Sequence, residues 1–137
     1  MAALPLHAEY LEHLPEADRK HLSAVALKAF FRITDAWALG DEDRRVLLGS
    51  PARSTYYRWK KGDAPAVGVD TLERISYLLG VYKALHILFP DPRQADGWLL
   101  RPNTLPPFEG ASPLAYLRGG RMLHLAQVRQ FLDAWRG

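Results

Sequence analysis

Residues 41–61, DEDRRVLLGSPARSTYYRWKK, are the stretch on which the interpretation of the fold depends. Asp41 stands where a helix N-cap is expected, and the two acidic residues after it suit the positive end of a helix dipole. Gly49 predicts the end of this short helix. Ser50 and Pro51 then predict the cap and first turn of a second helix that runs to the end of the stretch. Helix, tight turn and helix is the order of a helix-turn-helix.

A helix-turn-helix places its second helix in the major groove of DNA, while the first crosses the phosphate backbone. Arginine, serine and threonine at the start of the second helix can read base edges, and later tyrosines and basic residues can reach phosphates. Between residues 44 and 61 there are six basic residues and no acid, which indicates either a phosphate-binding surface or a solvated face. The predicted DNA-binding residues are Arg53, Ser54, Thr55, Tyr57, Arg58, Lys60 and Lys61.

The same layout also fits a tight helical hairpin inside a small bundle. Two features depart from the usual helix-turn-helix: Arg45 occupies a position that normally holds a small residue, and the turn from Gly49 to Trp59 is one residue longer than usual. We expect Trp59, and either Tyr56 or Tyr57, to pack in the core rather than stack on bases, because one face of this helix must close the fold.

On the N-terminal side, residues 4–14 carry apolar side chains four apart, which predicts a short helix or an ordered arm. Pro15 suits the first turn of a following amphipathic helix. The apolar pattern of that helix continues to about residue 38, and Leu39-Gly40 is the predicted end.

On the C-terminal side, Asp70 and Glu73 form the pattern of a capping box that opens a long buried helix, which Pro90 stops. Residues 101–113 are rich in proline and lack periodicity, so they predict an ordered loop. An amphipathic helix closes the chain. Further helix starts are predicted at Asp91-Pro92 and Ser112-Pro113.

The composition of the 137 residues, 48% hydrophobic and 24% charged, is that of a globular protein with one domain or two small ones. No useful strand-like alternation occurs, so the predicted fold class is all-α. We expect a helical arm and helix-turn-helix domain over residues 1–68 and a small helical module over residues 69–137.

Several functional classes find no support in the sequence. The absence of cysteine excludes disulfides and thiolate metal sites. The five histidines lack metal-ligand spacing, and no phosphate-binding loop or nucleophile elbow occurs. No apolar run approaches the ~20 residues that cross a bilayer, and the N-terminus does not have the layout of a secretory signal. These observations predict a cytoplasmic protein that is not an enzyme and binds neither metal nor cofactor.

Residues 47–60, LLGSPARSTYYRWK, resemble the helix-turn-helix of the Xre/MbcA/ParS antitoxins. The second half of the chain is similar to the toxin-binding module of the same family. The resemblance covers about residues 20–137, and in the second half it is carried by Trp98-Leu99, Pro102-Asn103, Phe108, Gly110, Ser112-Pro113-Leu114 and Gly120.

The resemblance implies an antitoxin that represses its own operator and blocks a RES-domain toxin that degrades NAD. In this family the C-terminal module binds the toxin, and the last residues can plug the entrance of its active site. An arginine beside a terminal carboxylate suits a pocket built for an anionic dinucleotide. The residues that the resemblance assigns to toxin binding are Asn103, Phe108, Ser112, Arg129, Trp135, Arg136 and Gly137.

Because helix-turn-helix proteins read two half-sites, we also expect a homo-oligomer, at least a dimer, with residues 4–38 in part of the contact. Two other interpretations stay open. The chain could be a helix-turn-helix transcriptional or polar-localisation regulator without a toxin partner. It could also be a protein-binding adaptor with a decayed helix-turn-helix, which Arg45 would signal. Trp98, Phe108, Phe131 and Leu132 are also expected to be core residues.

Overall fold

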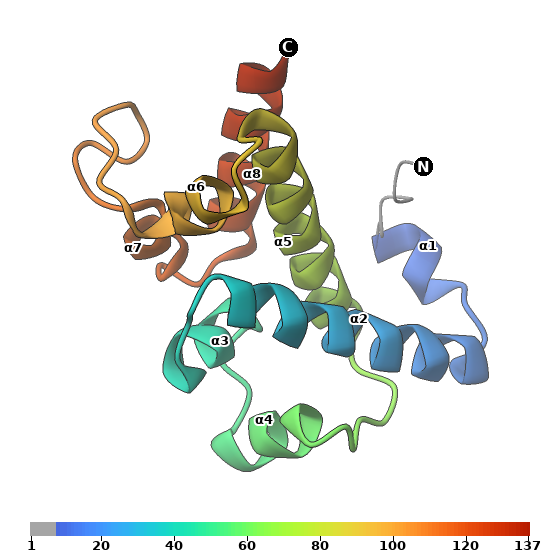
Figure 1. Cartoon of the computed structure of the whole chain (residues 1–137). Coiled ribbons are helices and arrows are strands. Elements are labelled where there is room, and N and C mark those ends of the chain that lie inside the picture. The colour runs from blue at the N-terminus through green and yellow to red at the C-terminus, as the bar shows by residue number, and fades with distance from the viewer. Residues whose placement is uncertain (1–7) are drawn as a thin grey trace.

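The computed structural model describes residues 8–137, and over this range the fold is all-α, as the sequence predicts (Figure 1). No strand occurs among these residues. Residues 1–7, which include the first four residues of the predicted arm at 4–14, lie outside the described part. The helices are α1 (Ala8–Glu12), α2 (Glu16–Ala36), α3 (Asp41–Leu47), α4 (Arg53–Lys60), α5 (Val69–Leu88), α6 (Pro92–Gly97), α7 (Pro113–Leu117) and α8 (Met122–Arg136), with a 3-10 turn η1 at Trp98–Leu100.

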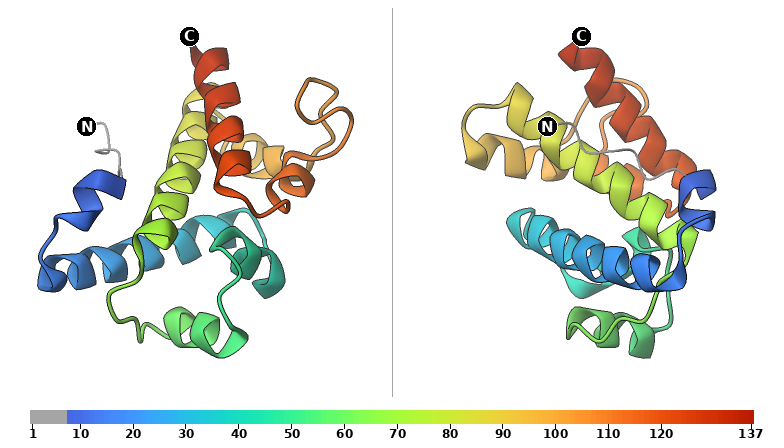
Figure 2. Two further views of the ribbon diagram at one scale, coloured as in Figure 1. Left: turned by 180° about the vertical axis from the view of Figure 1, so that it is seen from behind. Right: turned by 90° about the vertical axis from the view of Figure 1, so that its right-hand side faces the viewer.

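Helix α5 joins two groups of helices into one molecule. Helices α1 and α2 pack against it, and α4 packs on α2. Helices α6 and α8 also pack against α5, and α7 packs on α8 and η1 (Figures 1 and 2). The side chains of α5 that face these neighbours are fully buried, and their spacing of three or four residues forms one continuous apolar stripe. They include Leu72, Ile75, Leu78, Val81 and Leu85.

The end of α2 differs from the prediction. The sequence placed it at Leu39-Gly40, whereas Ala38 already has a φ of 57° and follows the last helical turn. The N–H of Ala38 donates to the carbonyl of Asp35 (2.9 Å), and that of Leu39 donates to Thr34 (3.0 Å). This is the paired pattern of a Schellman motif, here formed with alanine in place of the usual glycine. The helix therefore ends two residues early, and Leu39 is free to enter the core.

Three predicted N-caps are wrong. Gly40, and not Asp41, is the N-cap of α3, because the Asp41 carboxylate binds side chains of α4 instead. Ser50 has a φ of 57° and belongs to the turn, so α4 begins at Arg53. Asp70 lies inside α5, where it accepts a hydrogen bond from Arg74 (2.9 Å), and no side chain caps that helix.

Other predicted boundaries are confirmed. Gly49 and Gly62 have φ angles of 94° and 90° where α3 and α4 end. The side chain of Asp91 accepts from the N–H of Arg93 (3.0 Å) at the start of α6, and Ser112 accepts from Ala115 (3.1 Å) at the start of α7. Pro15 is an exception, because it stands just before α2 rather than in its first turn.

Within residues 8–137, no helix has both the length and the apolar character that a membrane span requires.

Candidate nucleic-acid interface and C-terminal module

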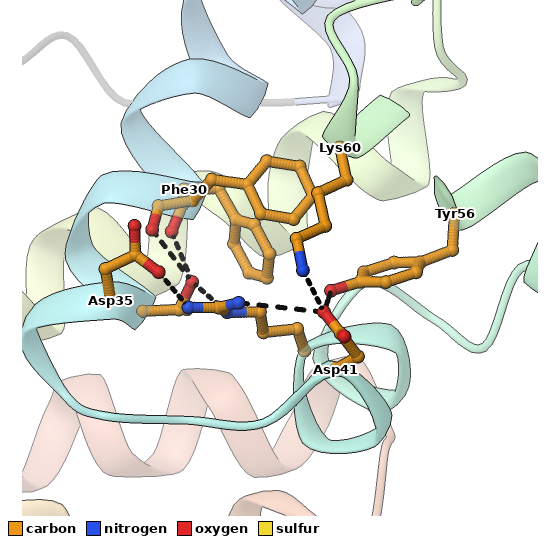
Figure 3. Close-up of polar contacts among 8 residues, drawn as sticks. Phe30, Asp35, Asp41, Tyr56 and Lys60 are labelled. Atoms are coloured by element: carbon orange, nitrogen blue, oxygen red, sulfur yellow. Dashed lines mark hydrogen bonds and ion pairs between the residues drawn. The ribbon is translucent and has the colours of Figure 1, made fainter. Parts of the chain in front are cut away.

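A polar cluster fixes the second helix of the helix-turn-helix, α4, onto the first, α3 (Figure 3). One carboxylate oxygen of Asp41 accepts hydrogen bonds from the Tyr56 hydroxyl and the Lys60 ammonium, both at 2.7 Å. The hydrogen bond from Lys60, followed by that from Tyr56, lowers the pKa of Asp41. Burial raises the pKa of Tyr56, and its hydrogen bond to Asp41 raises it further. Tyr56 is therefore a neutral donor to a charged acceptor, a strong type of hydrogen bond.

The cluster extends from Asp41 into α2 through the buried guanidinium of Arg44. The Nη1 atom of Arg44 lies 3.7 Å from the Asp41 carboxylate, and its Nε donates to the Thr34 hydroxyl (2.9 Å). Thr34 in turn donates to the backbone carbonyl of Phe30 (2.8 Å), and Arg44 also pairs with Asp35. Each buried polar atom thus has a partner, as a low-dielectric site requires. The cluster therefore joins α2, α3 and α4 through side-chain contacts.

Arg45 does not disrupt the packing of the two helices. Its side chain is 16% exposed and forms two hydrogen bonds with the Glu42 carboxylate, at 2.7 and 3.2 Å. Its Nη1 atom donates to the backbone carbonyl of Pro51 (2.9 Å). The hydrogen bond from Arg45 lowers the pKa of Glu42. The long side chain lies across the longer turn and bonds its backbone, so the two unusual features compensate each other.

Most of the predicted DNA-binding residues lie on the surface of α4, at the end of the molecule away from α8 (Figures 1 and 2). The Arg53 side chain is 72% exposed and lies 3.7 Å from Glu42. Arg58 is 59% exposed and pairs with Asp63 at 3.3 Å. Such exposed pairs exchange easily for phosphate because they contribute little to stability. Ser54, Tyr57 and Lys61 are also exposed, whereas Thr55 is half-buried.

Lys60 differs from the other predicted contacts because its ammonium group is bound to Asp41. Sequence periodicity could not reveal this pair, since the two residues are nineteen positions apart. Lys60 therefore serves the structure of the helix-turn-helix in addition to any contact with phosphate.

Two arginines connect the helix-turn-helix with the C-terminal module. Arg74 of α5 is buried and donates through Nη1 to the backbone carbonyl of Gly120 (2.7 Å). Arg118, which follows α7, pairs with Asp43 of α3 at 3.0 Å. Neither pair was predicted from the sequence.

Three residues that the sequence resemblance assigns to toxin binding have structural contacts of their own. Phe108 is 3% exposed and packs in a ring cluster with Trp98, Tyr116 and Phe131, at centroid distances of 5.1 to 5.8 Å. Phe108 is thus a core residue, as the sequence also predicted. Asn103 accepts from the N–H of Leu105 (2.9 Å) within its own loop, and Ser112 caps α7. These residues shape the loop between η1 and α7.

The remaining predicted toxin-binding residues lie on α8 and at its end. Trp135 is 54% exposed, and its ring meets that of Phe89 edge to face at 5.7 Å. Arg129 pairs with Asp133 at 3.1 Å and lies directly over Gly80 of α5, where an added Cβ would clash with its guanidinium. Arg136 lies 3.7 Å from Asp133, and Gly137 is exposed. Phe89 was not predicted as part of this surface, because its position four residues after Leu85 is typical of a core residue.

The chain is similar to known proteins over nearly its whole length. Residues 16–80 match the family described as the antitoxin Xre-like helix-turn-helix domain. Residues 84–137 match the antitoxin Xre/MbcA/ParS C-terminal toxin-binding domain. An uncharacterized protein of Sinorhizobium fredii, y4oB, is 48% identical over 125 residues, which are 90% of this chain and 92% of that protein.

Proposed function

Since the chain belongs to the Xre/MbcA/ParS antitoxins, with a helix-turn-helix domain and a toxin-binding domain, we propose that it neutralises a RES-domain, NAD-degrading toxin and represses its own operon. The observation that carries this proposal is that the two candidate surfaces are separate. The exposed basic residues of α4 lie at one end of the molecule, and the C-terminal end of α8 lies at the other (Figure 1). One molecule could therefore bind DNA and toxin together.

For the operator, we propose that α4 enters the major groove, with Arg53, Ser54 and Thr55 near base edges and Tyr57, Arg58 and Lys61 near phosphates. The cluster around Asp41 supports this role because it holds α4 in a fixed orientation before DNA arrives. Preorganised side chains lose less entropy on binding.

The DNA-binding half can be tested by fluorescence anisotropy with a labelled duplex from the region upstream of the gene. The Arg53→Ala, Arg58→Ala double variant should bind at least about tenfold more weakly than the wild type, with a reduced dependence on salt. A matched variant, Lys83→Ala with Arg93→Ala, removes the same charge from exposed positions of α5 and α6 and should bind normally. Equal losses in both variants would show that α4 does not carry DNA binding.

For the toxin, we propose that Trp135 and Arg129 form contacts and that Arg136 and Gly137 enter the active-site mouth. An exposed aromatic ring beside basic side chains is typical of the residues that dominate protein interfaces. Affinity purification from the native host tests this half. The wild type should retain a RES-domain protein, and a chain without residues 136–137 should fail to inhibit it. Recovery of the chain without such a partner would favour a regulator that has no toxin.

We further propose that the protein acts without catalysis, in the cytoplasm, as a dimer on two operator half-sites. Exposed apolar side chains of the N-terminal helices, Tyr10 (54% exposed) and Val25 (53% exposed), support the expectation that this segment contributes to the dimer. Sedimentation of the wild type and of the Tyr10→Ser, Val25→Ser variant tests this assignment. A dimer that persists in the variant would place the contact elsewhere.

A further inference from the structure

A cavity of about 360 Å³ lies between α2 and α4, behind the helix proposed to enter DNA. Its apolar walls are Leu27 and Phe31 of α2 and Trp59 of α4. Gly62 and Ala64, in the loop that leads from α4 to α5, line the cavity as well. This volume is within the range of about 300–1,000 Å³ that is usual for small-molecule sites.

Positive charge surrounds this apolar space. Three lysines line the cavity, Lys28, Lys60 and Lys61, and no carboxylate does. Lys60 is bound to Asp41. Among the side chains of residues 10–137, Lys28 and Lys61 have no carboxylate partner, so no charge of this part of the chain neutralises theirs.

We propose that this cavity binds a small organic anion with a flat apolar body, of the aromatic carboxylate type. The apolar body would lie against Phe31 and Trp59, where aromatic rings offer large contact areas. The carboxylate would accept charge-assisted hydrogen bonds from Lys28 and Lys61, which come from two different elements. A neutral molecule of the same shape would leave both ammonium groups without a partner, so the lysines select for an anion.

An anion in the cavity should weaken DNA binding. This inference rests on the function proposed above. Lys61 belongs both to the cavity and to the proposed phosphate contacts. An anion bound to Lys61 neutralises a charge that DNA would otherwise use. By thermodynamic linkage, the anion and DNA then weaken each other's binding by the same factor.

The probe for this site is 2-naphthoate, with 2-naphthalenemethanol as a neutral compound of matched shape. The readout is the indole N–H signal of Trp59 in a two-dimensional NMR spectrum, assigned by its loss in Trp59→Phe. We expect 2-naphthoate to shift this signal in a saturable way and the neutral alcohol to bind at least about tenfold more weakly, as for the loss of a hydrogen bond to a charged group. The signals of Trp37, Trp98 and Trp135, which do not line the cavity, should stay in place.

Matched variants separate the charges from the apolar walls. Lys28→Gln with Lys61→Gln should weaken 2-naphthoate binding by on the order of tenfold. Lys20→Gln with Lys83→Gln removes the same charge from exposed positions outside the cavity and should leave binding unchanged. Ala24→Met, at an exposed cavity-lining position of α2, should reduce binding by filling space.

Three results would overturn the proposal: an unmoved Trp59 signal, equal affinity for the neutral alcohol, or normal binding by the Lys28→Gln, Lys61→Gln variant. Equal affinity for the alcohol would identify an apolar docking site for a protein side chain instead. The effect on DNA is measured separately by anisotropy. If 2-naphthoate shifts Trp59 but leaves DNA affinity unchanged, the cavity stands and the role of Lys61 in DNA binding is wrong.

Discussion

The guanidinium of Arg74 donates a hydrogen bond of 2.7 Å to the backbone carbonyl of Gly120, across 46 positions of sequence. The same side chain pairs with Asp70 through Nε, and that nitrogen lies 3.1 Å from the point where a Cβ on Gly49 would be. One buried arginine therefore contacts the turn of the helix-turn-helix, the central helix and the backbone just before α8. The two halves of the molecule share this contact.

Replacing Arg74 by methionine keeps most of the side-chain volume and removes the donor to Gly120. We expect the free energy of unfolding to fall by about 2 kcal/mol, the usual effect of losing a hydrogen bond from a charged group. Urea denaturation measures it. Arg93→Met, at a side chain that is 94% exposed, is the control and should change stability little. Similar losses in both variants would show that the contact with Gly120 does not stabilise the fold.

Gly49→Ala tests the tight approach of Arg74 to the turn. Gly49 has a φ of 94°, so alanine is strained there, and its Cβ would also press on Arg74. Gly62 has a similar φ of 90° but open space around it, so Gly62→Ala measures strain alone. We expect about 1–3 kcal/mol of destabilisation from strain in each variant, and a larger loss for Gly49→Ala. A smaller loss at Gly49 would mean that Arg74 moves aside freely.

The stability that Asp41 provides should depend on pH. Because its pKa in the fold is lowered, the ionised carboxylate stabilises the fold above the unfolded pKa of about 4. This contribution is lost as the pH falls through the lowered pKa. Asp41→Asn should therefore be less stable than the wild type by about 1 kcal/mol at pH 7, a value that allows for partial exposure. In urea denaturation the stabilities of the two proteins should converge only as the pH falls from about 4 through the lowered pKa of Asp41. A constant difference at all pH values would contradict the ion pair with Lys60.

Trp135→Ala tests the surface at the end of α8. The ring is 54% exposed, so its removal should change stability by less than the loss of a core aromatic, about 3–5 kcal/mol. As an exposed interface aromatic, it should cost at least about 2 kcal/mol of toxin affinity in calorimetry. Leu123, 60% exposed near the start of the same helix, provides the matched control Leu123→Ala. A larger loss of affinity for the Leu123 variant would move the toxin surface to the other end of α8.

Local patterns predicted the helices well but not the side-chain partners that cross between them. Apolar spacing and the glycines at positions 49 and 62 placed α3, α4 and α5 nearly as the structure has them. Asp41 and Asp70 were expected to cap helices because an acid near a helix start usually does so. Both instead pair with basic side chains, and for Asp41 the partners come from another helix. Whether an aspartate accepts from backbone N–H groups at the helix start or from another side chain depends on tertiary packing, which spacing does not encode.

The candidate site residues also fall into those that local sequence patterns predicted and those that they did not. The exposed face of α4 was predicted because its basic residues follow the turn directly. The pairing of Lys60 was not, since it depends on a residue from another helix.

The most direct test of the proposed function measures growth and cellular NAD in bacteria that express a RES-domain protein together with this chain. The chain is supplied as the wild type, as the Arg53→Ala, Arg58→Ala variant, and without residues 136–137. The first two should restore growth and NAD, and the shortened chain should not. Failure of the wild type to restore NAD, or equal failure of the arginine variant, would contradict an antitoxin with separate surfaces for DNA and toxin.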